Sequence, residues 1–361
     1  MSRYQHVAQA VFGQPWMVRP ETLTTMAALV RLRAEGGHLD AAEIRARLDG
    51  AAAVAGPRRG ARTMGSVGVI PIYGLIMPRA NLMTEMSGGT SLSDVRASFR
   101  QALEDEAIGS ILFDVDSPGG AADGVEELAT EIRDARGRKP IVVIADFMMA
   151  SAAYYLGAQA DEVVASPSSS VGWIGTVTWH TEFSRADEMA GITTTVIRNP
   201  VGKYGANEFE PLSEKARADL QQQVDDLSVQ FHAAVAKGRG VSVARVRSDF
   251  GQGGGMMAAR AKVVGLVDRV ESFDATVRRL ASGRGPAPRG SGAVGGLQWT
   301  GVPMPVLDEG GDAPPADDPD ASASGEAGPP PDDGSVNETP DTDASSDQLD
   351  LDRLKHRAHS R

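Results

Sequence analysis

The chain has 361 residues, 41% of them hydrophobic, and a formal net charge of −12. This length and composition suffice for at least one large core and suggest two or three structural units. The absence of cysteine excludes disulfides, thiolate metal sites and a cysteine nucleophile. The histidines show no metal-ligand spacing, no run of about 18 apolar residues predicts a membrane span, and no basic stripe with interleaved aromatic residues predicts nucleic-acid binding. We therefore expect a cytosolic chain with no metal, cofactor, membrane contact or nucleic-acid partner.

Residues 1–65 predict a helical arm and a linker. The stretch MVRPETLTTMAALVRLRAE carries apolar residues at helical spacing after Pro20, and a second short helix is expected over residues 40–48. GPRRGARTMG, which starts at Gly56, is typical of a flexible linker.

Residues 66–281 alternate strand and helix patterns. Strands are predicted at 67–76, 110–115, 141–145, 162–165, 193–197 and 266–270. Helices are predicted at 91–104, 125–136, 150–159, 182–190 and 213–237. Such alternation indicates an α/β domain whose parallel strands are joined by crossover helices.

Two tail segments follow this domain. Residues 282–346 are rich in Pro, Asp, Gly and Ser and predict a disordered linker, and residues 347–361 predict a short docking helix with a basic end. Residues 285–361 hold 15 acidic residues against five Lys or Arg, so most of the negative charge belongs to the tail and says nothing about an active site.

Ser151 is the candidate nucleophile. It follows the strand-like run PIVVIA and opens the small-residue stretch SAAYYLGAQA, so no bulky neighbour blocks its hydroxyl. The free N–H groups at a helix start suit an oxygen that carries negative charge. A small-residue helix packed on a sheet explains the same stretch without any chemistry.

Two glycine-containing motifs stand near Ser151 in the predicted order of elements. DSPGG, residues 116–120, lies at a strand-to-helix turn, where Gly119 and Gly120 allow backbone N–H groups to face a ligand, although a Pro-Gly-Gly turn is also ordinary. VGWIGT, residues 171–176, is an extended segment that either accepts a peptide as an added strand or forms an ordinary core strand.

A serine nucleophile needs a base, and Lys203 is the candidate. It lies in the loop RNPVGKYGANEFEPLSE, and burial would allow a lysine to lose its proton near neutral pH. A solvated loop lysine is the other interpretation. His180 with Asp161 or Asp187 offers a Ser-His-Asp set, but the GxSxG elbow is missing around Ser151, which favours serine with lysine.

The ordered motifs DSPGG, ASAAYYLGAQAD, SVGxIG and a lysine before EPLSEKAR resemble the signal peptide peptidase A family of serine peptidases, in particular the head-maturation (prohead) proteases of tailed phages. The likeness covers about residues 67–280. The spacing of 52 residues from Ser151 to Lys203 is similar to the family's spacing between nucleophile and base.

The resemblance implies a Clp protease/crotonase-like fold with repeated ββα units and a Ser151–Lys203 dyad. Oxyanion donors would be the N–H of Gly119 or Gly120 together with that of Ala152. A peptide would lie along Gly172, Trp173, Ile174 and Gly175. Trp173 stands where the family usually has a small residue, so we expect a narrower groove there.

The resemblance also implies a biological setting. Capsid and scaffolding proteins, and the chain itself, would be the substrates of a homo-oligomer in the host cytoplasm, inside the assembling procapsid. The basic end of the tail would bind the inner surface of the capsid protein. The lack of a membrane anchor favours this branch over a bacterial signal-peptide-peptidase-like protease.

Two other functions remain open at this point. A crotonase-like acyl-CoA hydratase or isomerase shares the fold but would use carboxylates, for which only Glu126 and Glu127 stand near the glycine turns. A non-catalytic capsid-assembly scaffold would retain the domain without turnover.

Overall fold

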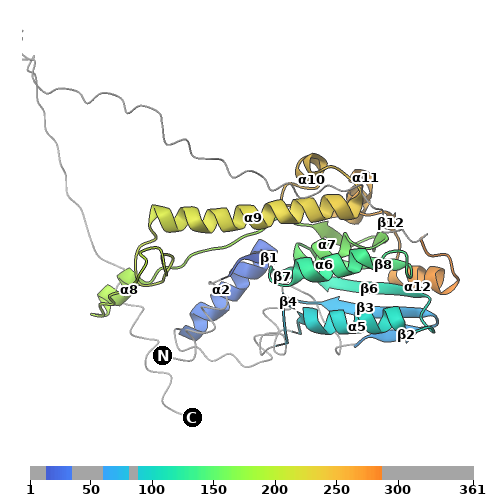
Figure 1. Ribbon diagram of the computed structural model, residues 1–361, viewed down its shortest axis with the longest axis horizontal. Coiled ribbons are helices and arrows are strands. Elements are labelled where there is room, and N and C mark those ends of the chain that lie inside the picture. The colour runs from blue at the N-terminus through green and yellow to red at the C-terminus, as the bar shows by residue number, and fades with distance from the viewer. Residues whose placement is uncertain (1–13, 35–59, 81–87, 287–361) are drawn as a thin grey trace, which may run out of the picture. The chain divides into compact units, whose positions relative to one another are not determined.

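The computed structural model describes residues 14–34, 60–80 and 88–286, which all belong to the first of two units, Met1–Leu297 and Gln298–Arg361 (Figure 1). The helices predicted at 40–48 and 347–361 lie outside the described residues, as does almost all of the predicted 282–346 linker.

Parallel strands form the centre of the main sheet. Its order is β11 (Gly255–Met257), β10 (Ser170–Gly172), β8 (Ile141–Ala150), β6 (Ser110–Ser117), β3 (Val67–Tyr73) and β2 (Arg62–Met64). β3, β6, β8 and β10 are mutually parallel, and the edge strands β2 and β11 are antiparallel to their neighbours. A branch of β9 (Glu162–Ala165) and β12 (Arg269–Val270) joins β8 in parallel.

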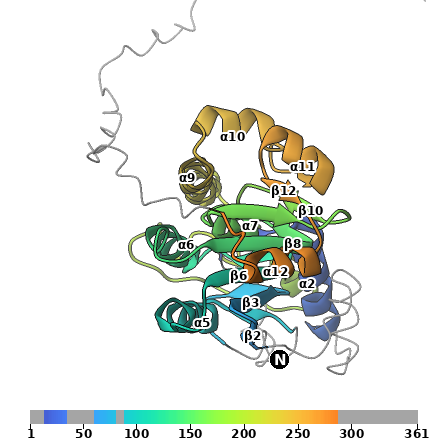
Figure 2. The same cartoon turned by 90° about the vertical axis from the view of Figure 1, so that its right-hand side faces the viewer.

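Alternating side chains of these strands build a core on each face of the sheet. In β6, Ile111 and Phe113 face one cluster and Leu112 faces the other, as the two-residue period of a strand requires. The first cluster includes residues of α5 (Leu92–Glu104), α6 (Val125–Asp134), α7 (Ala152–Gly157), α9 (Glu214–Arg239), α10 (Val243–Asp249) and α11 (Ala258–Val264). The second cluster is covered by α12 (Phe273–Ala281). Figure 2 shows α5 and α6 one above the other on one side of the main sheet.

A second, small sheet stands beside the main one. Its order is β1 (Trp16–Val18), β7 (Gly119–Ala121), β4 (Ile76–Met77) and β5 (Thr90–Ser91). The sequence predicted only a helical arm in this N-terminal region. The structure instead has an extended strand between Pro15 and Pro20, and α2 (Pro20–Ala34) starts at the second proline, whose fixed φ suits the first helical position.

The long helix α9 packs on α7 through its C-terminal half. The rings of Tyr155 and Phe231 lie 4.7 Å apart, and Gln159 Nε2 donates to the carbonyl of Ala234 at 3.2 Å. Gly238 allows the closest backbone approach, because a Cβ there would lie 2.3 Å from the carbonyl oxygen of Ala158. This contact fixes α9 relative to the helix that follows Ser151.

The predicted α/β class is confirmed, with parallel strands connected through helices. Element ends differ: the helix predicted at 150–159 begins at Ala152 because β8 continues to Ala150. The strand predicted at 193–197 is wrong, since this segment has no strand partner and is largely exposed. The apolar–polar pattern of ITTTVI predicted a strand, but a strand also needs a neighbouring edge to pair with.

We predict that Gly238→Ala lowers the free energy of unfolding by about 1–3 kcal/mol, because the new methyl group overlaps the backbone of Ala158. This cost outweighs the gain of about 1 kcal/mol that alanine brings to a helix interior. Urea unfolding followed by circular dichroism measures the difference.

Gly60→Ala is the matched control, because no atom lies within 4 Å of a Cβ at that position. A Gly238→Ala protein as stable as this control would show that α7 and α9 do not pack as described.

Candidate active site

Ser151 lies at the sharp turn between β8 and α7. Its φ of 52° and ψ of −116° are unusual for a residue with a side chain, and its N–H donates to the carbonyl of Gly172 at 2.8 Å. The residue is only 1% exposed, and its Oγ lies 3.5 Å from the carbonyl oxygen of Gly175. The surrounding strands therefore hold a serine in a strained conformation, a feature that is common at functional sites.

The glycine turn meets Ser151 because β6 and β8 end together. Ser117 is paired with Met149, and the chain then turns into Gly119, whose φ is 101°. A Cβ on Gly119 would lie 3.0 Å from Ser151 Cβ, whereas one on Gly120 would lie 1.9 Å from the carbonyl oxygen of Ile76. The two glycines thus differ: Gly119 borders the serine, and Gly120 lies against β4. The Gly119 N–H donates to Ser117 Oγ at 3.1 Å.

The segment after β10 runs beside Ser151. Gly172 is the parallel partner of Ala150, and Trp173 follows with a φ of 52°. The Trp173 ring packs on Gly255, where a Cβ would lie 2.2 Å from it, and the Arg19 guanidinium lies 5.0 Å from the ring centroid. Ile174 is buried. The predicted peptide-binding residues are therefore adjacent to Ser151.

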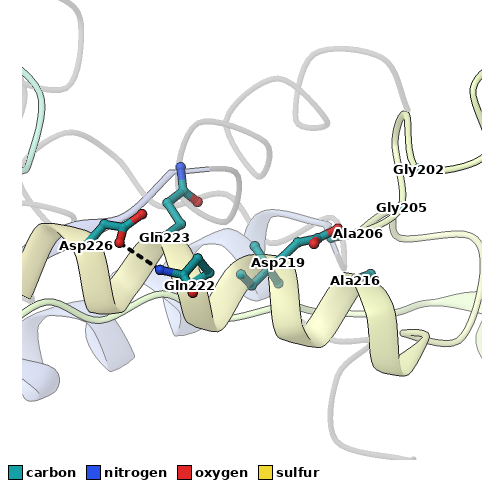
Figure 3. Close-up of a pocket in the computed structure, with 9 residues that line it drawn as sticks. Gly202, Gly205, Ala206, Ala216, Asp219, Gln222, Gln223 and Asp226 are labelled. Atoms are coloured by element: carbon teal, nitrogen blue, oxygen red, sulfur yellow. Dashed lines mark hydrogen bonds between the residues drawn. The ribbon is translucent and has the colours of Figure 1, made fainter. Parts of the chain in front are cut away.

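Lys203 lies elsewhere. It is exposed, in the turn of residues 201–204. This turn packs on the first turns of α9: a Cβ on Gly202 would lie 3.8 Å from Lys215 Cε, and one on Gly205 would lie 3.5 Å from Ala216 Cβ. The same loop and helix form a shallow pocket lined by Gly202, Gly205, Ala206, Ala216, Asp219, Leu220, Gln222, Gln223 and Asp226 (Figure 3).

The length of α9 separates this turn from Ser151. Ala216 marks the end of α9 that holds the lysine turn, and Phe231 marks the end that contacts α7. Fifteen residues at 1.5 Å each amount to about 22 Å along the helix. A lysine side chain cannot span this distance, so a single copy does not bring Ser151 and Lys203 together.

The alternative catalytic sets do not assemble either. His180 Nε2 lies 2.9 Å from the carbonyl of Asn207, and Asp161 accepts from the Ile141 N–H at the opposite end of β8 from Ser151. Asp187 is partly buried on α8 (Ser184–Met189), and no hydrogen bond or ion pair joins its side chain to His180 or Ser151 within the described residues. Of the two carboxylates considered for acyl-CoA chemistry, Glu126 accepts from the Tyr155 hydroxyl and from Thr130 Oγ1, and Glu127 is exposed.

A group of acids in the second halves of β6 and β8, with Asp114 buried and Asp116 and Asp146 partly buried, was missed from the sequence. Burial, reinforced by the charges of Asp146 and Asp114, raises the pKa of Asp116 to about 6. Burial also raises the pKa of Asp114, whose Oδ2 accepts from the Tyr73 hydroxyl. The signal was available, because alternate residues of one strand, 114 and 116, share a face.

Within the described ranges, no cluster of three or more His, Cys, Asp or Glu is placed to hold a metal ion. Over the same residues, every helix is too short or too polar to cross a bilayer.

The fold is that of an α/β protein in which a strained serine stands at a strand-to-helix turn, at the carboxyl ends of parallel strands. Residues 133–285, which include both Ser151 and Lys203, match the family model described as Peptidase family S49. The predicted resemblance to signal peptide peptidase A-like peptidases of the phage branch is thereby confirmed.

Two curated relatives come from phages. The head-tail preconnector protein GP5 of Enterobacteria phage P21 is 31% identical over 52% of this chain and 37% of its own length. The capsid assembly protease C of Escherichia phage lambda is 28% identical over 66% of this chain and 57% of its own length. The chain thus covers 37% of the length of the first relative and 57% of the length of the second.

Among solved structures, a point mutant of ClpP1 from Listeria monocytogenes aligns with a TM-score of 0.36 and 13% identity, over 58% of this chain and 94% of that one.

We predict that Asp116→Asn stabilises the protein increasingly as the pH rises from about 4 to 6. The folded-state pKa of Asp116 lies above its ordinary value of 3.8, so the folded wild type loses stability as the pH passes through this window. Below about pH 4 Asp116 is protonated in both the folded and the unfolded state. Above about pH 6 it is ionised in both states, and the free-energy cost of burying its charge no longer changes with pH. Urea unfolding of both proteins at pH 4, 5, 6 and 7 measures the difference, and a pH-independent difference would contradict the assignment.

Proposed function

We propose that the chain is a serine endopeptidase with a Ser151–Lys203 dyad that cleaves capsid and scaffolding proteins and itself. The observation that carries the proposal is the strained Ser151 beside Gly119, in a segment that matches a peptidase family. A serine fixed at such a turn has a hydroxyl that can attack a carbonyl carbon, and nearby backbone N–H groups can donate to the oxyanion that forms.

In the proposed reaction, Ser151 Oγ attacks the carbonyl carbon of a peptide bond and Lys203 Nζ takes the hydroxyl proton. The N–H groups of Gly119 and Ala152 stabilise the oxyanion, and the first of these exchanges its bond to Ser117 Oγ for the substrate oxygen. Lys203 then gives the proton to the leaving amine. Water hydrolyses the acyl-serine by the same steps in reverse order.

The distance between the pair leads us to propose that Lys203 acts on Ser151 of a neighbouring copy. The segment that carries the lysine exposes several large apolar side chains, including Ile197 at 94% and Val201 at 82%. An exposed apolar group of this kind is typical of an interface. A homo-oligomer in which residues 183–204 pack on the next copy would bury these side chains and deliver the lysine.

The names of the two phage relatives support a capsid setting. We propose that the chain acts in the host cytoplasm inside the assembling procapsid, on capsid and scaffolding proteins. The C-terminal segment, residues 285–361, is proposed to recruit it there, with its basic end on the capsid protein. A tail-deleted chain that still enters procapsids would contradict this role.

A non-catalytic capsid-assembly scaffold is the second candidate. Two observations favour it: Ser151 is buried, and the lysine turn packs on α9 at a point about 22 Å along this helix from the contact of Phe231 with α7. Either function fits the family match, so turnover has to be measured.

We predict that Ser151→Ala and Lys203→Ala each abolish cleavage of the chain and of co-purified capsid protein, followed by intact mass over time. Mixing the two inactive variants in equal amounts should restore about a quarter of the wild-type sites, because an intact serine then meets an intact lysine of its neighbour in about one site of four. A dyad within one copy would give no activity in the mixture.

Lys215→Ala is the matched control. This lysine lies on the adjacent first turn of α9, is exposed, and pairs with Asp219 at 3.0 Å. The control should cleave like the wild type. Stable wild-type protein with every substrate tried would favour the scaffold.

A further inference from the structure

A strand of the same chain, β1, lies between two backbone segments beside Ser151. β7 forms one wall, and the segment around Val177 forms the other. β1 lies between them: Trp16 exchanges both backbone hydrogen bonds with Val177, at 2.8 and 2.9 Å, and pairs with Ala121 on its other side. An extended segment hydrogen-bonded between two strands is the way in which a strand-accepting cleft holds a peptide.

This strand approaches the nucleophile directly. β1 runs antiparallel to β7, so that Val18 is the partner of Gly119, and the Arg19 N–H donates to the carbonyl of Pro118 at 2.9 Å. A Cβ on Gly119 would lie 2.2 Å from the carbonyl oxygen of Met17 and 3.0 Å from Ser151 Cβ. Gly119 is therefore enclosed between the backbone of β1 and the serine, and Ser151 is 1% exposed.

Two side chains hold β1 in place. Trp16 is buried in a small cluster with Val18, Leu23, Met26, Leu75, Met77 and Ala121. Arg19 lies over the Trp173 ring and donates through Nη1 to Met148 Sδ at 3.4 Å. The strand is only three residues long, so few backbone pairs have to break for it to leave.

We propose that residues 15–19 are an internal occupant of the substrate cleft, an autoinhibitory strand that an incoming peptide must displace. The inference rests on the proposed function for the identity of the cleft, and it adds regulation to it. While β1 is bound, a substrate cannot pair with Gly119 and Ala121. The apparent affinity for a peptide is therefore reduced by the fraction of molecules in which the cleft is open.

A reversible disulfide tests the proposal, because the chain contains no cysteine of its own. Trp16 and Ala121 are antiparallel partners, and the backbone groups of Trp16 point to Val177 instead. Such a non-hydrogen-bonded pair has Cα atoms about 4.5 Å apart, within the range of disulfides. In W16C/A121C the oxidised form locks β1 in the cleft, and the reduced form has lost the tryptophan that anchors it.

Binding is measured by fluorescence anisotropy with a labelled peptide of residues 14–20, QPWMVRP, in the Ser151→Ala background. We expect the reduced double-cysteine protein to bind at least about tenfold more tightly than the oxidised protein and than the parent with Trp16. The control peptide QPWPVRP lacks the N–H of Met17, which faces β7, and should bind weakly to every form. Single W16C and A121C proteins should not respond to oxidant.

Equal binding by the oxidised and reduced proteins, or binding by neither, would overturn the proposal and leave β1 as a fixed wall. Because the measurement uses Ser151→Ala, it needs no catalysis. Redox-dependent binding without cleavage by the Ser151-containing protein would leave the autoinhibitory strand standing and contradict the peptidase instead.

Discussion

The parallel pairing of β6, β8 and β10 is the constraint on which the rest of the site depends. Parallel strands place their carboxyl ends at one edge of the sheet, where ligands of α/β proteins are usually bound. Here that edge collects the turn at Gly119, the serine at position 151 and the bend at Trp173. A slip of β8 by one residue would turn Ser151 away from the glycine turn, so the register itself is part of the chemistry.

The second requirement is that the backbones of neighbouring strands approach closely at this edge of the sheet, which explains why glycines stand there. Gly119 has the backbone of β1 on one side and the serine on the other, and Gly120 has the backbone of β4 against it. A methyl group at either position would separate strands that have to touch. The glycines thus determine which strands can meet at this edge of the sheet.

Much of this arrangement follows from the sequence. Strong periodicity in residues 66–281 predicted the parallel sheet, and a small-residue stretch after PIVVIA predicted Ser151 at a strand-to-helix turn. The sequence left open which of Gly119 and Gly120 borders Ser151, because adjacent glycines differ only in the groups that pack on them. β1 was missed for a related reason: three residues carry no readable period, and this strand exists through its long-range partners.

The location of Lys203 shows another limit. Sequence spacing fixes the number of residues between two groups, but a helix of known pitch decides where they lie in space. The segment after β10 travels outward to the far end of α9 and returns only along the helix, so residues 52 positions apart in the chain are separated by most of a helix length.

The length of α9 therefore sets both the distance of the lysine turn from α7 and the direction in which this turn points. Each added residue would move the lysine turn by about 1.5 Å and rotate it by about 100°, and a whole turn would move it by about 5.4 Å with the direction nearly restored. An insertion of one or two residues in the middle of α9 would aim the turn at another face, and one of three or four would keep its direction at a new distance. If Lys203 has to meet a fixed partner, changes in the length of α9 by whole helical turns would disturb the direction of the lysine turn least.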